Sequence, residues 1–190
     1  MENIYLVAMT APTPTFDNVD GLVSHLRELA TLGSDEGLAF SELDHGLQTA
    51  AILEAAHPDD VELQVAGLVH DLAHPWDGPG QPEHHRMGAR AVRDLLGERV
   101  AFLIEAHVDA KRYLVATDAG YQAALSPGSV LTLDAQGGPL SPEEIVTVEQ
   151  HPDWKAAVAL RRADDGSKVV GAVVPDLDHW IAAIHDVAGR

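Results

Sequence analysis

An adjacent histidine and aspartate, His70 and Asp71, lie in an otherwise apolar stretch that reads Gly-Leu-Val-His-Asp-Leu-Ala-His. Burying an imidazole beside a carboxylate is costly unless a partner compensates for the lost hydration, and a metal cation is the usual partner. His74 is expected one helical turn beyond His70 on the same face. Pro75 should end the helix, so the three side chains would face one cavity. A structural His–Asp hydrogen bond at a helix end is the alternative.

The chain contains eleven histidines in 190 residues, and several of them are placed where they could lie in one pocket. Taken singly, each has an ordinary explanation, such as a satisfied core histidine. That explanation weakens for a set that falls on five successive expected helices. Imidazole and carboxylate ligands suit iron, manganese or zinc, and the carboxylate of Asp71 could bridge two metals. The members of this set beyond the His-Asp pair are His45, His84 or His85, His107 and Asp164.

Two cationic side chains are spaced to face the same pocket. Lys111 lies one helical turn after His107, and Arg161 lies one turn before Asp164. Only three lysines occur in the chain, so this placement predicts a local positive region on an acidic protein. Salt bridges to the many carboxylates would explain each residue, but not their shared placement.

The charge of the chain restricts its partners. Its formal net charge is −18, which disfavours nucleic acid and anionic membranes. A small anionic substrate would also be repelled unless cations are gathered at its site. Ser129 and Thr132, three residues apart at an expected helix N-terminus, offer hydroxyl and backbone N–H groups to such an anion.

The composition is that of one folded domain. Hydrophobic residues make up 46% and charged residues 22%, and we expect a single domain over 1–190 with its core at about 19–187. The absence of cysteine excludes disulfides and thiolate metal sites. The apolar run Tyr5–Met9 is too short to span a membrane, and no basic cluster precedes it, so a cytoplasmic protein is expected.

Apolar residues at helical spacing, between capping and breaking residues, predict an all-α fold. No segment alternates with period two for long enough to predict a strand, and Pro12 and Pro14 make residues 1–17 irregular. The expected helices span 19–32, 41–56, 59–74, 83–96, 100–115, 126–133, 141–150, 154–168 and 177–187.

The order of these candidate ligands resembles the HD-domain superfamily, in which a His is followed by a His-Asp pair, two single His and a distal Asp. The resemblance implies a helical bundle around a dinuclear metal site. His84 is chosen over His85 because the His of that family precedes Gly-Ala by four and five residues, as His84 precedes Gly88 and Ala89. The implied metal ligands are His45, His70, Asp71, His84, His107 and Asp164.

Four runs resemble one branch, the mixed-valence diiron oxygenases that cleave phosphonates. Residues 107–114 read His-Val-Asp-Ala-Lys-Arg-Tyr-Leu, and residues 126–132 read Ser-Pro-Gly-Ser-Val-Leu-Thr. Residues 136–139 read Gln-Gly-Gly-Pro, and residues 160–168 read Leu-Arg-Arg-Ala-Asp-Asp-Gly-Ser-Lys. The related inositol oxygenases share the Asp-x-x-x-Lys spacing of the last run. The resemblance covers about 41–168.

This resemblance implies two iron ions, Fe(II) and Fe(III), with O2 as co-substrate, and cleavage of the C–P bond of a small hydroxylated organophosphonate or the C–C bond of a related anionic alcohol. The protein would be a monomer or small homo-oligomer. An HD phosphohydrolase acting on a phosphate ester is the main alternative, and a non-catalytic metal-binding domain a third. The residues implied to hold the anionic end are His74, Lys111, Ser129, Thr132 and Arg161.

One departure from that branch concerns the substrate. Its members carry a Tyr and an amine-binding Glu ten and seven residues before the first ligand His, where this chain has Asp35 and Leu38. A leucine offers neither charge nor a hydrogen bond to an ammonium group. We therefore expect a substrate that lacks the amino group, unless Asp35, Glu36 or Asp44 replaces the missing carboxylate.

Overall fold

The regular structure is helical throughout the described residues, apart from one isolated bridge between Gly33 and Ser41. The computed structural model describes residues 13–33, 39–77 and 82–190. The all-α prediction is confirmed for them. The helices are α2 (Val19–Leu29), α3 (Glu42–Ala56), α4 (Val61–Val69), the 3-10 helix η1 (His74–Trp76), α5 (His84–Thr117), α6 (Tyr121–Ala124), α7 (Pro127–Ala135), α8 (Pro142–Val148), α9 (Trp154–Gly166) and α10 (Leu177–Ala188).

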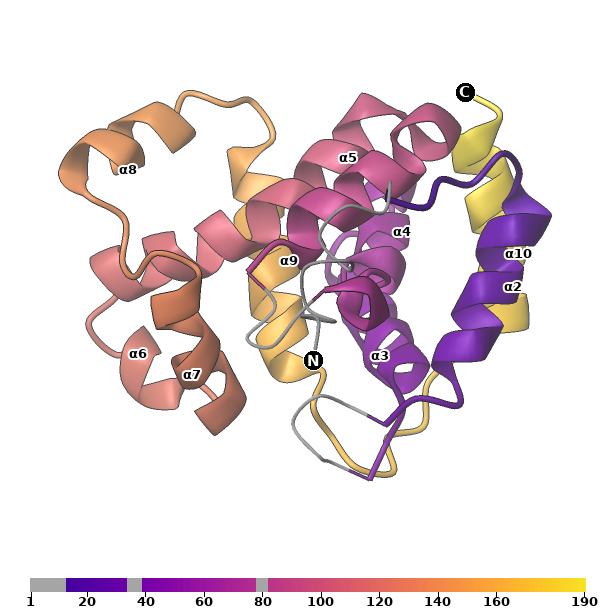
Figure 1. The fold of residues 1–190 in the computed structure, drawn as a ribbon, viewed down its shortest axis with the longest axis horizontal. Helices are drawn as coiled ribbons and strands as arrows, with labels where there is room; N and C mark the ends of the chain where they lie inside the picture. The colour runs from indigo at the N-terminus through magenta and orange to yellow at the C-terminus, as the bar shows by residue number, and fades with distance from the viewer. Residues whose placement is uncertain (1–12, 34–38, 78–81) are drawn as a thin grey trace, which may run out of the picture.

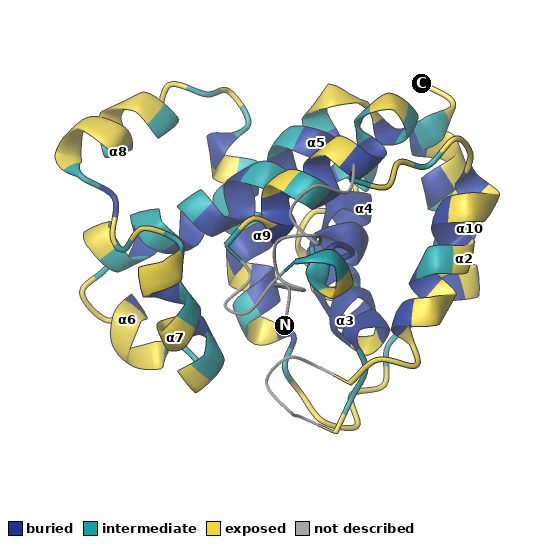
Figure 2. Ribbon diagram, viewed as in Figure 1, coloured by how far each residue is buried: buried dark blue, intermediate teal, exposed yellow. Residues whose placement is uncertain are grey.

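Four helices form the centre of the bundle. α3, α4, α5 and α9 pack against one another, and α2 and α10 lie together along one side (Figure 1). Every residue of α4 from Leu63 to Val69 is buried, and all are apolar except Gln64, whose amide donates to the His57 carbonyl at 2.8 Å. Buried residues concentrate on the four central helices in Figure 2, so a polar group placed there must find a partner.

The helix that carries the His-Asp pair ends earlier than predicted. α4 stops at Val69, His70 to Ala73 form a turn, and η1 follows. Two features explain this: Pro75 disfavours helical backbone at His74, and the His70 Nδ1 atom hydrogen-bonds the Gly67 carbonyl at 2.8 Å. The prediction that His70 and His74 lie one turn apart on a continuous helix is therefore wrong.

Most other helix ends agree with the sequence to within a few residues. Ser41 caps α3 in a capping box with Asp44, and Ser126 and Ser141 cap α7 and α8. The two helices predicted on either side of Gly97 form α5, which is interrupted at that glycine by a φ of 85°. α2 ends at Leu29, three residues before the predicted end, and the single turn of α6 was not predicted.

Helices α6 to α8 lie outside the central bundle, beside the second half of α5 (Figure 1). Arg112 of α5 contacts the segment between α7 and α8, and α8 itself. Its Nε atom donates to the Gly138 carbonyl at 2.8 Å, its Nη2 atom donates to Glu144 at 3.1 Å, and its own carbonyl accepts from Leu140 N. Two of the sequence runs singled out above, 107–114 and 136–139, thus meet in space.

None of the described helices is both long enough and apolar enough to cross a membrane.

Candidate metal centre

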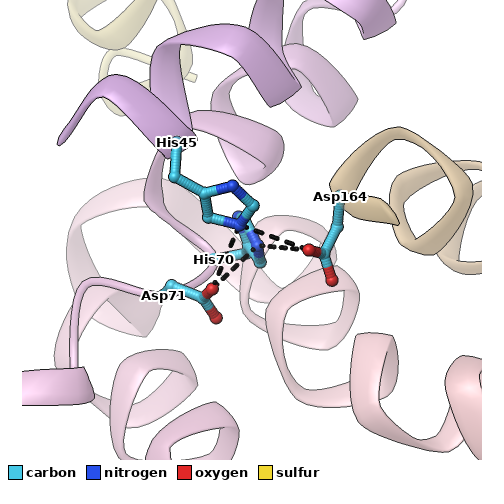
Figure 3. A group of neighbouring side chains, drawn as sticks. All are labelled: His45, His70, Asp71 and Asp164. Carbon is cyan, nitrogen blue, oxygen red and sulfur yellow. Dashed lines mark ion pairs between the residues drawn. The ribbon is translucent and has the colours of Figure 1, made fainter. Parts of the chain in front are cut away.

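Three separate elements bring a cluster of two imidazoles and two carboxylates together inside the bundle. His45 comes from α3, His70 and Asp71 from the turn after α4, and Asp164 from α9. One ligand atom from each of these four residues lies within 4.8 Å of the others. Figure 3 shows the two imidazole rings between the two carboxylates.

Backbone and hydroxyl partners orient the rings of these histidines. His70 Nδ1 lies 2.8 Å from the Gly67 carbonyl, and His107 Nδ1 lies 2.7 Å from the Ile104 carbonyl. His45 Nδ1 lies 3.0 Å from the Ser167 hydroxyl. When Nδ1 carries the proton and donates it to such a partner, Nε2 keeps its lone pair for a metal. All three Nε2 atoms face the cluster.

The carboxylate of Asp71 lies between two groups of imidazoles. Its Oδ2 atom is 3.4 Å from His45 Nε2 and 3.2 Å from His70 Nε2. Its Oδ1 atom is 3.2 Å from His74 Nε2, and 3.5 and 3.6 Å from the Nε2 atoms of His84 and His107. One carboxylate thus presents one oxygen to each side, which is the arrangement that a bridging ligand requires.

The cluster is chemically incomplete without a cation. His70 Nε2 and Asp71 Oδ1 are buried, and within the described residues no hydrogen bond reaches either atom. The Nε2 atoms of His84 and His107 also lie only 3.2 Å apart, and the roles of the two rings in this contact depend on their tautomers. Buried acceptors in this number need a shared positive partner, and a nitrogen and oxygen donor set of this kind suits iron, manganese or zinc.

Charge pairing within the cluster shifts the protonation of its members. Burial opposes the charged form of His70, but the carboxylates of Asp71 and Asp164 outweigh it and raise its pKa to about 10. A metal that binds Nε2 would therefore displace a proton from this ring. Burial would raise the pKa of Asp71 and Asp164. The neighbouring imidazoles and, for Asp164, the Arg161 guanidinium instead hold both well below the ordinary range. Both carboxylates therefore carry negative charge, as metal ligands must.

His84 and His85 differ in what they face. His84 Nε2 points to Asp71 and His107, as given above, whereas His85 Nδ1 is buried without a hydrogen bond from any described residue. Burial, together with the charges of His84 and Arg86, lowers the pKa of His85 to about 3. Of the two histidines, the geometry places His84 with the cluster.

The predicted anion-binding residues lie on the α7 and α9 side of the cluster. The ammonium of Lys111, which is almost fully buried, donates to the Thr132 hydroxyl at 2.9 Å. Arg161 Nη2 donates to the Ser129 hydroxyl at 3.3 Å, and Arg161 Nη1 donates to Asp164 Oδ2 at 2.6 Å. Burial, reinforced by the Arg161 charge, lowers the pKa of Lys111 to about 7. Two cationic side chains and two hydroxyls thus lie beside the candidate metal cluster.

His74 has a different position from the other anion-binding candidates. Its Nδ1 atom lies 2.9 Å from Glu42, a buried carboxylate, and its Nε2 atom faces Asp71 Oδ1. Its ring also belongs to a group of possible metal ligands with Asp71 and His84. The structure therefore places His74 beside the second imidazole group, where it could contact either a metal or the substrate.

Several polar residues of this region were not singled out from the sequence. They are Glu42, Tyr121, Asp165 and Ser167. Glu42 precedes His45 by three residues, so helical spacing could have placed it on the same face. Asp165 and Ser167 lie inside the run 160–168. No comparable signal marks Tyr121. The predictions made for Asp35 and Leu38 fall outside the described residues.

Comparison with known proteins agrees with this geometry. The HD domain family matches residues 22–147. The chain is 35% identical over 166 residues to a hydroxymethylphosphonate dioxygenase of Gimesia maris, covering 80% of this chain and 82% of the relative. It is 32% identical over 155 residues to a 1-hydroxy-2-(trimethylamino)ethylphosphonate dioxygenase (glycine-betaine-forming) of Leisingera caerulea, covering 77% and 79%. The chain therefore belongs to the HD domain family, as its His-Asp pattern predicted.

Proposed function

We propose that this protein is a diiron oxygenase that uses O2 to cleave the C–P bond of a small hydroxylated phosphonate, with hydroxymethylphosphonate as the first candidate. The two dioxygenases among its relatives support the oxygenase activity over hydrolysis of a phosphate ester. The observation that carries the dinuclear assignment is the placement of Asp71, whose two oxygens face two different groups of imidazoles.

The ligands of the two metals divide at Asp71. His45, His70 and Asp164 would hold the first iron with Asp71 Oδ2. His84 and His107 would hold the second with Asp71 Oδ1. When bound, the irons would supply the one-electron chemistry that activates O2.

The protein's own residues bind and orient the phosphonate. Lys111 and Arg161 give the anion two charge-assisted contacts in a site largely removed from water, where such contacts are strong. Ser129 and Thr132 add hydroxyl groups next to these cations. Holding the phosphonate here would place the hydroxyl-bearing carbon towards the metal cluster, because Arg161 contacts both Ser129 and the ligand Asp164.

The choice of an amine-free substrate follows from the sequence at 35–38 and is supported by one relative. Leu38 cannot pair with an ammonium group, and the substrate that gives the Gimesia maris enzyme its name has no amino group. For hydroxymethylphosphonate the balance is simple: one O2 is consumed, and one formate, one phosphate and one proton are formed.

The test is an assay of the iron-loaded protein, prepared without oxygen and then supplied with O2. We expect hydroxymethylphosphonate to consume O2 and release phosphate and formate in a 1:1:1 ratio. An aminated 1-hydroxyphosphonate should react more slowly. Faster turnover of the aminated compound would overturn the substrate assignment but not the oxygenase.

Phosphate esters serve as the comparison substrates. Hydrolysis of a phosphate monoester without O2 consumption, together with no reaction of any 1-hydroxyphosphonate, would instead support the HD phosphohydrolase. Mössbauer spectra of the same preparation would count the irons and give their oxidation states. A protein with a single zinc, inert to O2, would contradict the proposal.

A further inference from the structure

The guanidinium of Arg161 is held by two residues that are not proposed as metal ligands, one on α9 and one on α6. Asp165 lies four residues further along α9 and binds the guanidinium through both oxygens, Oδ1 to Nη2 and Oδ2 to Nε, the second at 3.3 Å. Tyr121, on the single turn of α6, accepts from Arg161 Nε at 3.0 Å. Neither residue lies in a position implied to bind metal or substrate.

Tyr121 and Asp165 are also joined to each other. The Tyr121 hydroxyl donates to Asp165 Oδ2 at 2.5 Å while it accepts from Arg161, so its hydrogen bonds close a ring of three side chains. The Tyr121 residue is only 8% exposed. Burial and the Asp165 charge raise the pKa of Tyr121, which keeps its hydroxyl protonated and able to donate.

Donor groups of the guanidinium that this ring does not use face the candidate site. Nη1 donates to the ligand Asp164, and Nη2 reaches the hydroxyl of Ser129. An arginine side chain has four rotatable bonds and loses much entropy when it is fixed, so a group that holds it before the anion arrives strengthens the binding of that anion. The effect should fall on binding, because Tyr121 and Asp165 contact Arg161 rather than the reacting atoms.

We propose that Tyr121 and Asp165 are positioning residues that hold Arg161 between the metal ligand Asp164 and the anion-binding hydroxyl of Ser129, and thereby set the affinity for the phosphonate end of the substrate. The proposal rests on the proposed function in one respect, the assignment of Arg161 to the anion.

Replacing Asp165 distinguishes a role in positioning Arg161 from a purely electrostatic effect of its charge on the bound anion. The change Asp165→Asn removes a negative charge from beside the proposed anion-binding residues, so a purely electrostatic role predicts tighter binding of an anion. A positioning role predicts weaker binding, because the guanidinium loses a two-oxygen partner. The direction of the change therefore distinguishes the two.

The experiment measures anion binding and turnover separately in Tyr121→Phe and Asp165→Asn. Binding of methylphosphonate to the iron-loaded, oxygen-free protein is followed by calorimetry, and KM and kcat are measured with hydroxymethylphosphonate. We expect Kd and KM to rise about tenfold in each variant, the loss of one charge-assisted contact. The value of kcat should stay within about twofold and the iron content should be unchanged.

Two matched variants serve as controls. Tyr113→Phe removes a hydroxyl that donates to Glu149 at the surface, and Asp186→Asn breaks an exposed i,i+4 pair with Arg190, the same spacing as Arg161 and Asp165. Both should leave Kd and KM unchanged.

The possible failures can be told apart. Wild-type protein that binds methylphosphonate but does not turn over hydroxymethylphosphonate contradicts the proposed function alone. Unchanged Kd in both variants, tighter binding in Asp165→Asn, loss of iron, or a fall in kcat without a change in KM overturns the positioning role.

Discussion

At the scale of single residues, the two carboxylates of the cluster should differ in what their loss removes. Asp71 faces both imidazole groups, whereas Asp164 Oδ1 faces only His45 and His70. We therefore expect Asp71→Ala to lose metal from both proposed positions. Asp164→Ala should keep a substantial part of the second metal, which His84 and His107 are proposed to hold. Iron per protein, measured by mass spectrometry, checks this. Equal iron loss in the two variants would mean that Asp71 does not bridge.

Lys111 should make kcat/KM fall at alkaline pH. Its pKa of about 7 means that its charge is present below pH 7 and lost as the pH rises through that value. The affinity for an anion falls with it, so kcat/KM for a hydroxyphosphonate should decrease up to tenfold per pH unit above about pH 7. Lys111→Arg should move this limit to higher pH, because a guanidinium keeps its charge.

The control for Lys111 is Lys155→Arg, which changes an exposed lysine of α9. Its pH profile should match that of the wild type. A Lys111→Arg profile that falls off at the same pH as the wild type would assign the titration to another group.

The sequence predicted which residues form the candidate site better than it predicted which other residues contact them. The types and order of the six candidate ligands could be predicted because they match a known sequence pattern. Helical spacing could place Glu42 on the face of His45, but its contact with His74 could not be predicted, since the two residues are 32 apart and meet only in the packed bundle.

At the scale of helices, the approach of α3 to α4 is set by a glycine. A Cβ atom on Gly46 would lie 2.3 Å from the Leu68 carbonyl oxygen, which belongs to the backbone and cannot rotate away. Gly46→Ala should therefore push the helices apart and lower the free energy of unfolding by about 1–3 kcal/mol. Because His45 and His70 lie on either side of this contact, iron content should also fall.

Gly21 of α2 offers the matched control, since a Cβ atom there would lie 3.6 Å from Asn18 Oδ1, an ordinary van der Waals contact. Gly21→Ala should raise the free energy of unfolding by up to about 1 kcal/mol, because alanine favours helix over glycine. Urea denaturation of both variants gives the comparison. A Gly46→Ala protein as stable as the wild type would show that the helices do not approach this closely.

Helix positions were predictable where caps and apolar spacing agree, as in α3 with its Ser41 capping box. They were not where tertiary contacts decide. α4 ends at Val69, where the His70 ring hydrogen-bonds the Gly67 carbonyl. α6 is a single turn whose only buried residue is Tyr121. Helices of one turn have little stability of their own, so no local pattern predicts them.

At the scale of the whole molecule, the candidate metal centre joins elements that are distant in sequence. The HD domain match ends at residue 147, yet α9 contributes Asp164 to the cluster and packs against α3, α4 and α5. Ligands from before and after that boundary therefore share one core. This contact supports the expectation of one domain over 1–190, which remains a prediction.

Because residues of α3, the turn after α4, α5 and α9 meet at the candidate metal centre, removing the proposed metal should destabilise the whole bundle. Metal that binds only the folded state stabilises it by about 2.7 kcal/mol when its free concentration is one hundred times Kd. For a chain of this length, each kcal/mol corresponds to roughly 2–4 °C in Tm. Stripping the iron with a chelator should therefore lower Tm by at least about 5 °C, and adding iron back without oxygen should restore it. A Tm that stays constant while the iron content falls would mean that the cluster is held by the fold alone and that its buried carboxylates are compensated by protonated histidines.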